Sequence, residues 1–491
     1  MSYERKSAYS NTESLGIILR QYGYLSSINL IENEIVPFPL FQATIKFVST
    51  SADLADLDLQ SQLEIGKQLY YPARTSRFKN PFTSIRPVYH ALLPHVTFSG
   101  QNLEPVWAND KGQAAIAWLK HKNEKILLIG LNVEEEIIRH RQGDPSKVLE
   151  SGTKGGFGFA HERANYLFED QIHPQYPTYP WADRLGFFLA ETFSQLSGYP
   201  LVDILPNGAK GAVILTGDDD QAFLEKYDEQ LRVIGDCPIT YLLVPQTRHT
   251  PETLAKMPSN VEIGLHPDAL EQPEQYDRLC TEQANFIRQL SGRSVRTLRN
   301  HGYLDRGYLG FLKTWEENKI GLSVNYSKAD GTVMNGSLLP MKMRTPDRNW
   351  SNHYSLLTAF GDGIIFALNQ TEKQAAKKIK QLVNQIESSV PGILVFNLHP
   401  QNIDSTRHLH KEVILLSQRL GWIAIGLDSY LDWLCMLDSI KIESTDKGFV
   451  LQSKQSIRDL SVRYFTKDGW QKEILAPWTN QIVLNIPKGK P

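Results

Sequence analysis

The stretch GAVILTGDDD, residues 211–220, joins a run of small and apolar residues to three consecutive aspartates. The run carries no alternating charged residues, so it predicts a strand buried on both faces, as in a parallel sheet. The aspartates fall at the carboxyl end of this strand, just before a helix predicted over 221–233. Carboxylates favour helix N-termini, so one of them is expected to cap the helix, and another is free for function.

The same arrangement repeats along the chain on both sides of this stretch. Amphipathic helices are expected over 273–290, from Thr371, and up to Leu420, where Gly421 is the stop signal. Between them lie short apolar strands, predicted at residues 239–244, 261–265, 295–298, 321–325, 393–397 and 423–427. Buried strands alternating with helices indicate a parallel sheet, and six to seven such units fit a closed or nearly closed (β/α) barrel.

Histidines and charged residues follow several of these strands. His266 follows VEIGL, Arg299 and His301 follow VRTL, and His399 follows ILVFNL. The carboxyl ends of all barrel strands open on one face, where active sites are built. An aspartate with two imidazoles is a typical ligand set for a divalent metal, and a bound metal activates water. The pattern therefore predicts metal-assisted hydrolysis of an amide or ester.

Four of these segments resemble the motifs of one enzyme family, the polysaccharide deacetylases (the NodB-homology, carbohydrate esterase family 4 group). TGDDDQ at 216–221 resembles the TFDDG motif, and EIGLHP at 262–267 resembles the EIGNH-type motif. Arg299 falls where an arginine motif is expected, and FNLHP at 396–400 resembles the last motif. The resemblance covers roughly residues 210–430. It implies a deformed NodB-like barrel of about seven strands, a divalent metal, zinc being the first choice, and a carbohydrate substrate.

Carried over to this chain, the family motifs imply a role for each matching residue: Asp218 as general base, Asp219 and His266 as metal ligands, Arg299 as the residue that orients the base, and His399 as general acid. The chain departs from the family at Leu270, where a second histidine is normal four residues after the first. We expect His301 to supply this ligand from the next strand, as in a divergent branch of the family. Asp220 replaces the usual glycine, so it is an alternative to Asp219 as ligand.

The flanking regions differ from the barrel in pattern. Residues 1–205 are expected to form an accessory α/β domain, residues 206–438 the barrel, and residues 439–491 a small antiparallel β module, because apolar and polar residues alternate there. The segment 330–362 is expected to be irregular and to shape the substrate pocket. Its candidate lining residues are Arg344, Asp347, Trp350 and His353.

Composition excludes several classes of protein. The chain has 491 residues and a net charge of −2, which gives no indication of a nucleic-acid partner. Three widely spaced cysteines indicate neither a disulfide framework nor a cysteine zinc site. No apolar run resembles a signal peptide or a membrane span, so a cytoplasmic location is expected. Homo-oligomerisation stays open.

The function predicted from the sequence is therefore a divalent-metal-dependent hydrolase that removes an N- or O-acyl group from a carbohydrate or glycolipid precursor. One alternative is a degenerate relative that binds saccharide without hydrolysing it, which Leu270 motivates. A second alternative is a glycosidase that uses paired carboxylates. The histidines at three strand ends make that alternative the weaker one.

Overall fold

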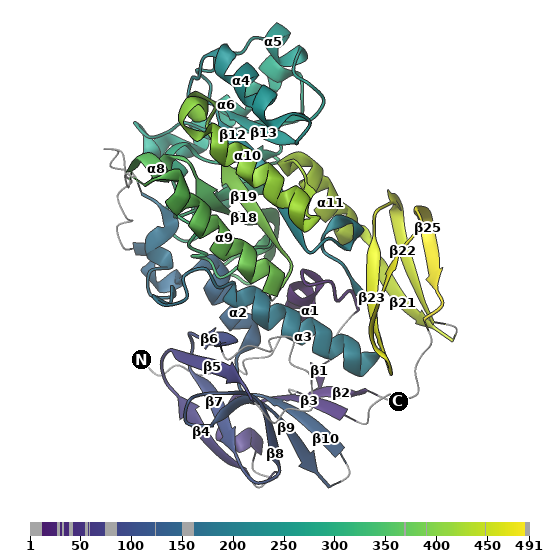
Figure 1. The fold of residues 1–491 in the computed structure, drawn as a ribbon. Helices are drawn as coiled ribbons and strands as arrows, with labels where there is room; N and C mark the ends of the chain where they lie inside the picture. The colour runs from purple at the N-terminus through teal and green to yellow at the C-terminus, as the bar shows by residue number, and fades with distance from the viewer. Residues whose placement is uncertain are drawn as a thin grey trace. The chain divides into compact units, whose positions relative to one another are not determined.

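The computed structural model describes residues 12–26, 30–31, 34–38, 43–54, 57, 59–73, 86–122, 124–149, 162–367, 370–388, 390–446 and 448–486 (Figure 1). The chain forms two compact units. The first contains the described residues of Met1–His140, Trp181–Gly208 and Met436–Pro491, and the second contains those of Arg141–Pro180 and Ala209–Cys435. The domain boundaries expected at residues 205 and 438 stay a prediction.

The second unit is built on a closed barrel of seven parallel strands. The strands in order around the ring are β12 (Gly211–Asp218), β13 (Ile239–Leu243), β14 (Val261–Leu265), β15 (Thr297–Leu298), β16 (Leu322–Tyr326), β18 (Trp350–Gly361) and β19 (Gly392–Asn397), which pairs again with β12. This confirms the predicted (β/α) barrel. The barrel is deformed because β15 contributes only two residues.

Helices follow most of the barrel strands, and the amphipathic patterns predicted four of them, those at 224–234, 276–291, 372–388 and 403–420. The helices are α4 (Leu224–Ile234), α5 (Pro251–Ala255), α6 (Tyr276–Ser291), α7 (Leu312–Glu317), α8 (Gly363–Ala367), α9 (Glu372–Ser388), α10 (Ile403–Leu420) and α11 (Leu427–Ser439). Before α9, the Gln374 side chain accepts the Thr371 N–H at 2.8 Å, and the Gln374 N–H donates to the Thr371 hydroxyl at 3.4 Å, which together form a capping box. Gly421 ends α10 with a left-handed φ of 63°, a conformation that glycine adopts without steric cost.

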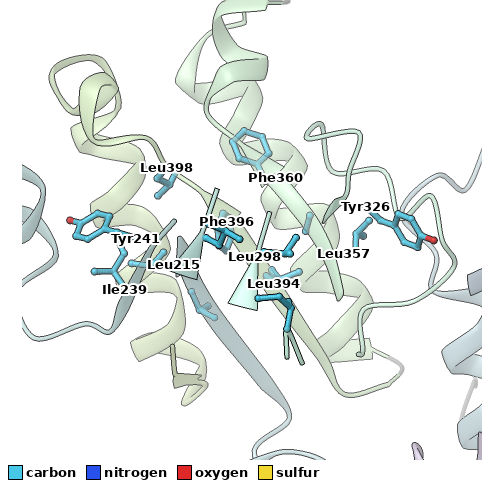
Figure 2. Packing of buried hydrophobic residues seen from close by; sticks show 14 of the residues in the cluster. Leu215, Ile239, Tyr241, Leu298, Tyr326, Leu357, Phe360, Leu394, Phe396 and Leu398 are labelled. Carbon is cyan, nitrogen blue, oxygen red and sulfur yellow. The ribbon is translucent and has the colours of Figure 1, made fainter. Parts of the chain in front are cut away.

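Alternate strand residues face opposite sides of the barrel wall, because side chains alternate along a strand. Leu215, Tyr241 and Phe396 belong to the buried core between strands and helices (Figure 2). That core also includes residues of α9 and α10 such as Ile379 and Leu409. The alternate residues of β12, which include Thr216 and Asp218, face the barrel interior instead. The carboxyl ends of the strands can therefore carry polar groups without disturbing the core.

Two expectations for the barrel were wrong. The segment 330–362 is not irregular: it contains β17 (Met341–Arg344), antiparallel to β18, and the twelve-residue strand β18 itself. Conversely, the strand expected over 423–427 does not enter the ring. Only β20 (Ile423–Ala424) forms, and it pairs with β12 alone. The apolar run in β18 was therefore the missing barrel strand.

The first unit consists mainly of antiparallel sheets. The largest sheet has ten strands: β1 (Leu30–Ile31), β2 (Glu34–Phe38), β3 (Ala43–Phe47), β4 (Gln60–Glu64), β5 (Gln68–Pro72), β6 (Tyr89–Ala91), β7 (His95–Ser99), β8 (Leu103–Ala108), β9 (Ala114–His121) and β10 (Glu124–Ile129). Its parallel pair is β3 with β10. The helices are α1 (Thr12–Arg20), α2 (Val133–Gln142) and α3 (Trp181–Ser197).

The end of the chain forms the small β module that the alternating pattern predicted. One three-stranded sheet contains β21 (Lys441–Thr445), β22 (Gly448–Ile457) and β25 (Trp478–Leu484). The other contains β11 (Leu201–Val202), β23 (Ser461–Thr466) and β24 (Gly469–Ile474). No helix in the described part of the chain is both long and apolar enough to cross a membrane. All three cysteines are free thiols.

Candidate active site

The predicted site residues gather at the carboxyl ends of four barrel strands, and Asp218 lies in the interior. Asp218 is the last residue of β12 and is 3% exposed. Arg299, at the end of β15, is fully buried and donates from Nη1 to Asp218 Oδ1 at 2.7 Å. Its Nη2 donates to the hydroxyls of Thr216 and Thr358, both at 2.9 Å. Asn397 donates to the other oxygen of Asp218 at 2.6 Å. Both carboxylate oxygens of Asp218 are thus held in place.

The charges around Asp218 keep it ionised. Burial by itself raises the pKa of a carboxyl group, because it disfavours the charged form. Here the charges of Arg299, His266 and His399 outweigh burial, and the pKa of Asp218 is lowered from its usual value. An ionised carboxylate that is oriented by an arginine and an amide is suited to accept a proton from a water molecule.

A second carboxylate, Asp220, converges with two histidines. The described residues contain a group formed by Asp220, His266 and His301, whose candidate ligand atoms all lie within 4.8 Å of one another. Asp220 Oδ1 lies 3.4 Å from His266 Nε2 and 3.6 Å from His301 Nε2. This oxygen is buried and has no hydrogen-bond partner among the described residues. Asp220 also has a left-handed φ of 41°, which is uncommon for a non-glycine residue and typical of functional sites.

The outer nitrogen of each histidine is engaged elsewhere. His266 Nδ1 lies 2.7 Å from the backbone oxygen of Arg299, which can only accept, so this nitrogen carries the hydrogen. His301 Nδ1 lies 3.1 Å from the carboxylate oxygen Asp268 Oδ1. Both arrangements leave Nε2 as the ligating atom, and the second nitrogen of a metal-binding histidine usually faces a carboxylate or backbone oxygen in this way.

The donor set fits a divalent metal. A neutral imidazole Nε2 and a carboxylate oxygen both present lone pairs, which repel unless a cation or proton lies between them. With metal–ligand bonds of about 2.0–2.1 Å in a tetrahedral site, the donor atoms lie about 3.3 Å apart. The separations of 3.4 and 3.6 Å from Asp220 Oδ1 are close to this value. Asp220, His266 and His301 could therefore hold zinc or a similar ion.

Asp219, the ligand implied by the family motif, lies outside this group. Its side chain is fully buried, and its Oδ1 accepts the hydroxyl of Tyr227 from α4. Burial raises the pKa of Asp219, and the hydroxyls of Tyr227 and Thr247 only partly oppose this. The aspartate that the structure brings to the two histidines is Asp220, the alternative left open by the sequence. Leu270, at the position of the family's second histidine, packs against the hydrophobic core.

His399 lies across from the group and is paired with an acid that the sequence did not indicate. Its Nδ1 is 2.5 Å from Asp362 Oδ1, at the end of β18, and its backbone N–H donates to Asp362 Oδ2 at 2.9 Å. Its Nε2 lies 3.7 Å from Asp218 Oδ2 and 3.5 Å from Asp220 Oδ2. Burial alone would lower the pKa of His399, but the charges of Asp362, Asp220 and Asp218 raise it to about 10. A protonated His399 can serve as a proton donor.

Three further polar residues of the site were not predicted: Asp362, Asn397 and Gln401. Gln401 donates from Nε2 to Asp220 Oδ2 at 3.2 Å, the oxygen that lies near His399 rather than near His266 and His301. The signal for Asp362 was present, since YSLLTAFGD ends an apolar run with an acid just as GAVILTGD does.

The structure gives each of the four candidate lining residues of the segment 330–362 a defined position in or beside strands β17 and β18. Arg344 is buried at the end of β17, and Asp347 is bound to the turn residues Thr345 and Asn349. Trp350 begins β18. His353 is fully buried and its two ring nitrogens contact Ile320 O at 2.9 Å and Ser323 Oγ at 2.8 Å. A role for these four residues in a pocket stays a prediction.

Comparison with known proteins gives matches among solved structures. Neither a family model nor a curated protein matches the chain. The peptidoglycan deacetylase PdaC from Bacillus subtilis is 12% identical, with a TM-score of 0.32, and the match covers 48% of this chain and 96% of PdaC. PuuE allantoinase is 14% identical, with a TM-score of 0.37, covering 48% of this chain and 94% of its own.

A third solved structure is a mutant of a carbohydrate esterase family 4 pseudoenzyme with restored activity. It is 16% identical, with a TM-score of 0.30, and the match covers 45% of this chain and 68% of that one. The solved structures that match the barrel include a peptidoglycan deacetylase and a protein of carbohydrate esterase family 4. At these identities the likeness concerns the fold.

Proposed function

We propose that the barrel is a divalent-metal-dependent hydrolase that removes an acyl group from an amino or hydroxyl group of a carbohydrate or glycolipid precursor. The observation that carries the proposal is the convergence of Asp220 Oδ1 with the Nε2 atoms of His266 and His301. The ionised Asp218, at the end of β12 two residues before Asp220, and the protonated His399, which follows β19, flank that group. The motif resemblance supports the same class of reaction.

Each residue then has a role that follows from its surroundings. Asp220, His266 and His301 would hold the cation, which when bound would lower the pKa of a water molecule and polarise the acyl carbonyl. Asp218 accepts the proton of the attacking water, and Arg299 keeps that carboxylate oriented and ionised. His399 donates a proton from Nε2 to the leaving nitrogen or oxygen. Asp362 fixes the ring of His399 through Nδ1.

The nature of the ligands favours zinc. Two imidazole nitrogens and one carboxylate oxygen leave positions open for water and substrate, which is the composition of catalytic zinc sites. Asp220 is proposed as the oxygen ligand in place of Asp219, because Oδ1 of Asp220 lies 3.4 and 3.6 Å from the Nε2 atoms of His266 and His301. A cytoplasmic location and a homo-oligomeric state stay predictions.

The experiment that tests the proposal measures metal binding and hydrolysis in the same preparations. Wild type, Asp220→Ala, Asp219→Ala and His266→Ala are stripped with chelator and titrated with Zn²⁺, and folding is checked by circular dichroism. We expect tight zinc binding in wild type and in Asp219→Ala, and its loss in the other two variants. Wild-type protein that binds no more zinc than Asp220→Ala contradicts the proposed site.

Hydrolysis is then assayed on zinc-loaded protein with N-acetylated chitooligosaccharides and p-nitrophenyl acetate. Release of acetate that depends on zinc and is lost in His399→Ala supports the hydrolase. The alternative, a saccharide-binding protein without activity, would show zinc binding and measurable oligosaccharide binding but no acetate release from either probe.

A further inference from the structure

Asp268 stands behind the metal-binding group in a position that the family motifs do not assign. It follows His266 by two residues and extends from the same loop after β14. Its Oδ1 lies 3.1 Å from Nδ1 of His301, whose other nitrogen faces Asp220 Oδ1 at 3.6 Å. The His301 ring is thus aligned between two carboxylates.

Asp268 is itself held by its neighbours. Gln283, on helix α6, accepts the backbone N–H of Asp268 and donates to its backbone oxygen, both at 2.7 Å. The N–H of Leu270 donates to Asp268 Oδ1 at 3.3 Å. Gln283 therefore fixes the backbone of Asp268. A side chain on a fixed backbone points in a defined direction, and the Asp268 carboxylate points toward His301.

The two histidines are anchored in different ways. His266 is anchored through a backbone oxygen, that of Arg299, which no side-chain substitution removes. His301 lies in a short 3-10 turn that includes left-handed backbone at Gly302 and Tyr303, and its Nδ1 contacts a side chain. The orientation of His301 therefore depends on which residue occupies position 268. His301 is also the ligand that departs from the family pattern, because it follows a different strand than the family's second histidine does.

We propose that Asp268 is the positioning residue that makes His301 a metal ligand, so that a His-x-Asp sequence at 266–268 together with His301 replaces the family's two histidines on one loop. The inference rests on the proposed metal site. Carboxylates that orient a ligating histidine strengthen its ligation, and their removal typically weakens metal binding about 10- to 100-fold. Leu270 cannot take this role, because it packs against the core.

The test is a double-mutant cycle on zinc affinity with the full chain. Metal-free wild type, Asp268→Asn, His301→Ala and the double variant are titrated with Zn²⁺ against a competing chelator. Asp236→Asn, the same substitution at an exposed carboxylate of the same unit, is the matched control. We expect Asp268→Asn to bind zinc about 10- to 100-fold more weakly than wild type, with Asp236→Asn unchanged. The double variant should match His301→Ala, because Asp268 acts only through His301.

A second measurement covers the case in which His301→Ala binds too weakly to quantify. In zinc-loaded wild type, the Nδ1 proton of His301 should give an exchange-protected NMR resonance that Asp268→Asn loses. If both the zinc affinity and this resonance are unchanged in Asp268→Asn, the inference is overturned, but the proposed metal site stands. The inference is also overturned if Asp268→Asn weakens zinc binding in the His301→Ala background by the same factor as in wild type. Wild type that binds no zinc at all instead removes the proposed function, and the inference with it.

Discussion

The guanidinium of Arg299 and the carboxylate of Asp218 form an ion pair of 2.7 Å in the interior of the barrel, and neither side chain is accessible to solvent beyond a few per cent. Buried charges are costly to leave alone, so removing one partner of such a pair typically destabilises a protein by about 3–5 kcal/mol. Arg299→Met should therefore lower the free energy of unfolding by about that amount, as measured by urea denaturation of metal-free protein.

The double variant Arg299→Met with Asp218→Asn separates the ion pair from simple loss of packing. With both charges removed, no uncompensated carboxylate remains, and much of the lost stability should return. A double variant as unstable as Arg299→Met, or less stable still, would mean that the methylene groups and hydroxyl contacts of Arg299 matter more than its charge.

The contact between His399 and Asp362 predicts a histidine that keeps its proton far above neutral pH. In metal-free protein, NMR titration of the His399 ring should give a pKa of about 10, and Asp362→Asn should lower it because the carboxylate in contact with Nδ1 is gone. The folded pKa lies above the ordinary value of 6.5. Its stabilising contribution is therefore complete below about pH 6.5 and is lost as the pH rises toward 10.

The same substitution has a consequence for activity. Because His399 must be protonated to donate, the alkaline limb of the rate profile should move to lower pH in Asp362→Asn. His353→Gln is a control at another buried histidine, which contacts neither Asp362 nor Asp218. An unchanged His399 titration in Asp362→Asn would contradict the assigned coupling.

Asp305 predicts a pH effect of the same sign as His399, in a lower pH window. Burial raises its pKa to about 7, and hydrogen bonds from Asn325 at 3.1 Å and from the Arg306 N–H at 2.9 Å only partly oppose this. Between about pH 4 and 7 the unfolded chain loses the Asp305 proton while the folded chain keeps it, so stability falls as the pH rises through this window. Asp305→Asn cannot ionise and should lack this fall in urea denaturation measured at intervals from pH 4 to 8.

The sequence predicted the features that depend on local patterns. Continuous apolar runs gave six of the seven barrel strands, and the polar residues after some of them located His266, Arg299, His301 and His399. Two features depended on more distant structure. Which of three adjacent aspartates meets the histidines follows from the left-handed backbone at Asp220 and from the hydroxyl of Tyr227 that engages Asp219. Asp362 was missed because its strand, β18, was expected to be irregular.

Glu262 supports the barrel far from the chemistry, by capping a helix that is remote in sequence. From β14, its carboxylate accepts the N–H groups of Asp428 at 2.7 Å and Ser429 at 3.0 Å in the first turn of α11. It also accepts the hydroxyls of Ser429 at 2.5 Å and Thr240 at 3.0 Å. The unpaired N–H groups of a helix N-terminus favour a negative charge, so this carboxylate acts as an N-cap supplied from another element.

Removing this cap should weaken the attachment of α11 to the barrel strand β14. Glu262→Ala leaves two backbone donors of α11 without their acceptor, and we expect a loss of about 1–3 kcal/mol in the free energy of unfolding. Glu262→Gln keeps one acceptor oxygen and should lose less. It also removes a charge that, after burial, raises the pKa of the neighbouring Asp428. Glu271→Ala, at an exposed glutamate after the same strand, is the matched control and should change stability little. If Glu262→Ala and Glu271→Ala unfold at the same urea concentration, the cap contributes nothing and α11 is held by its packing alone.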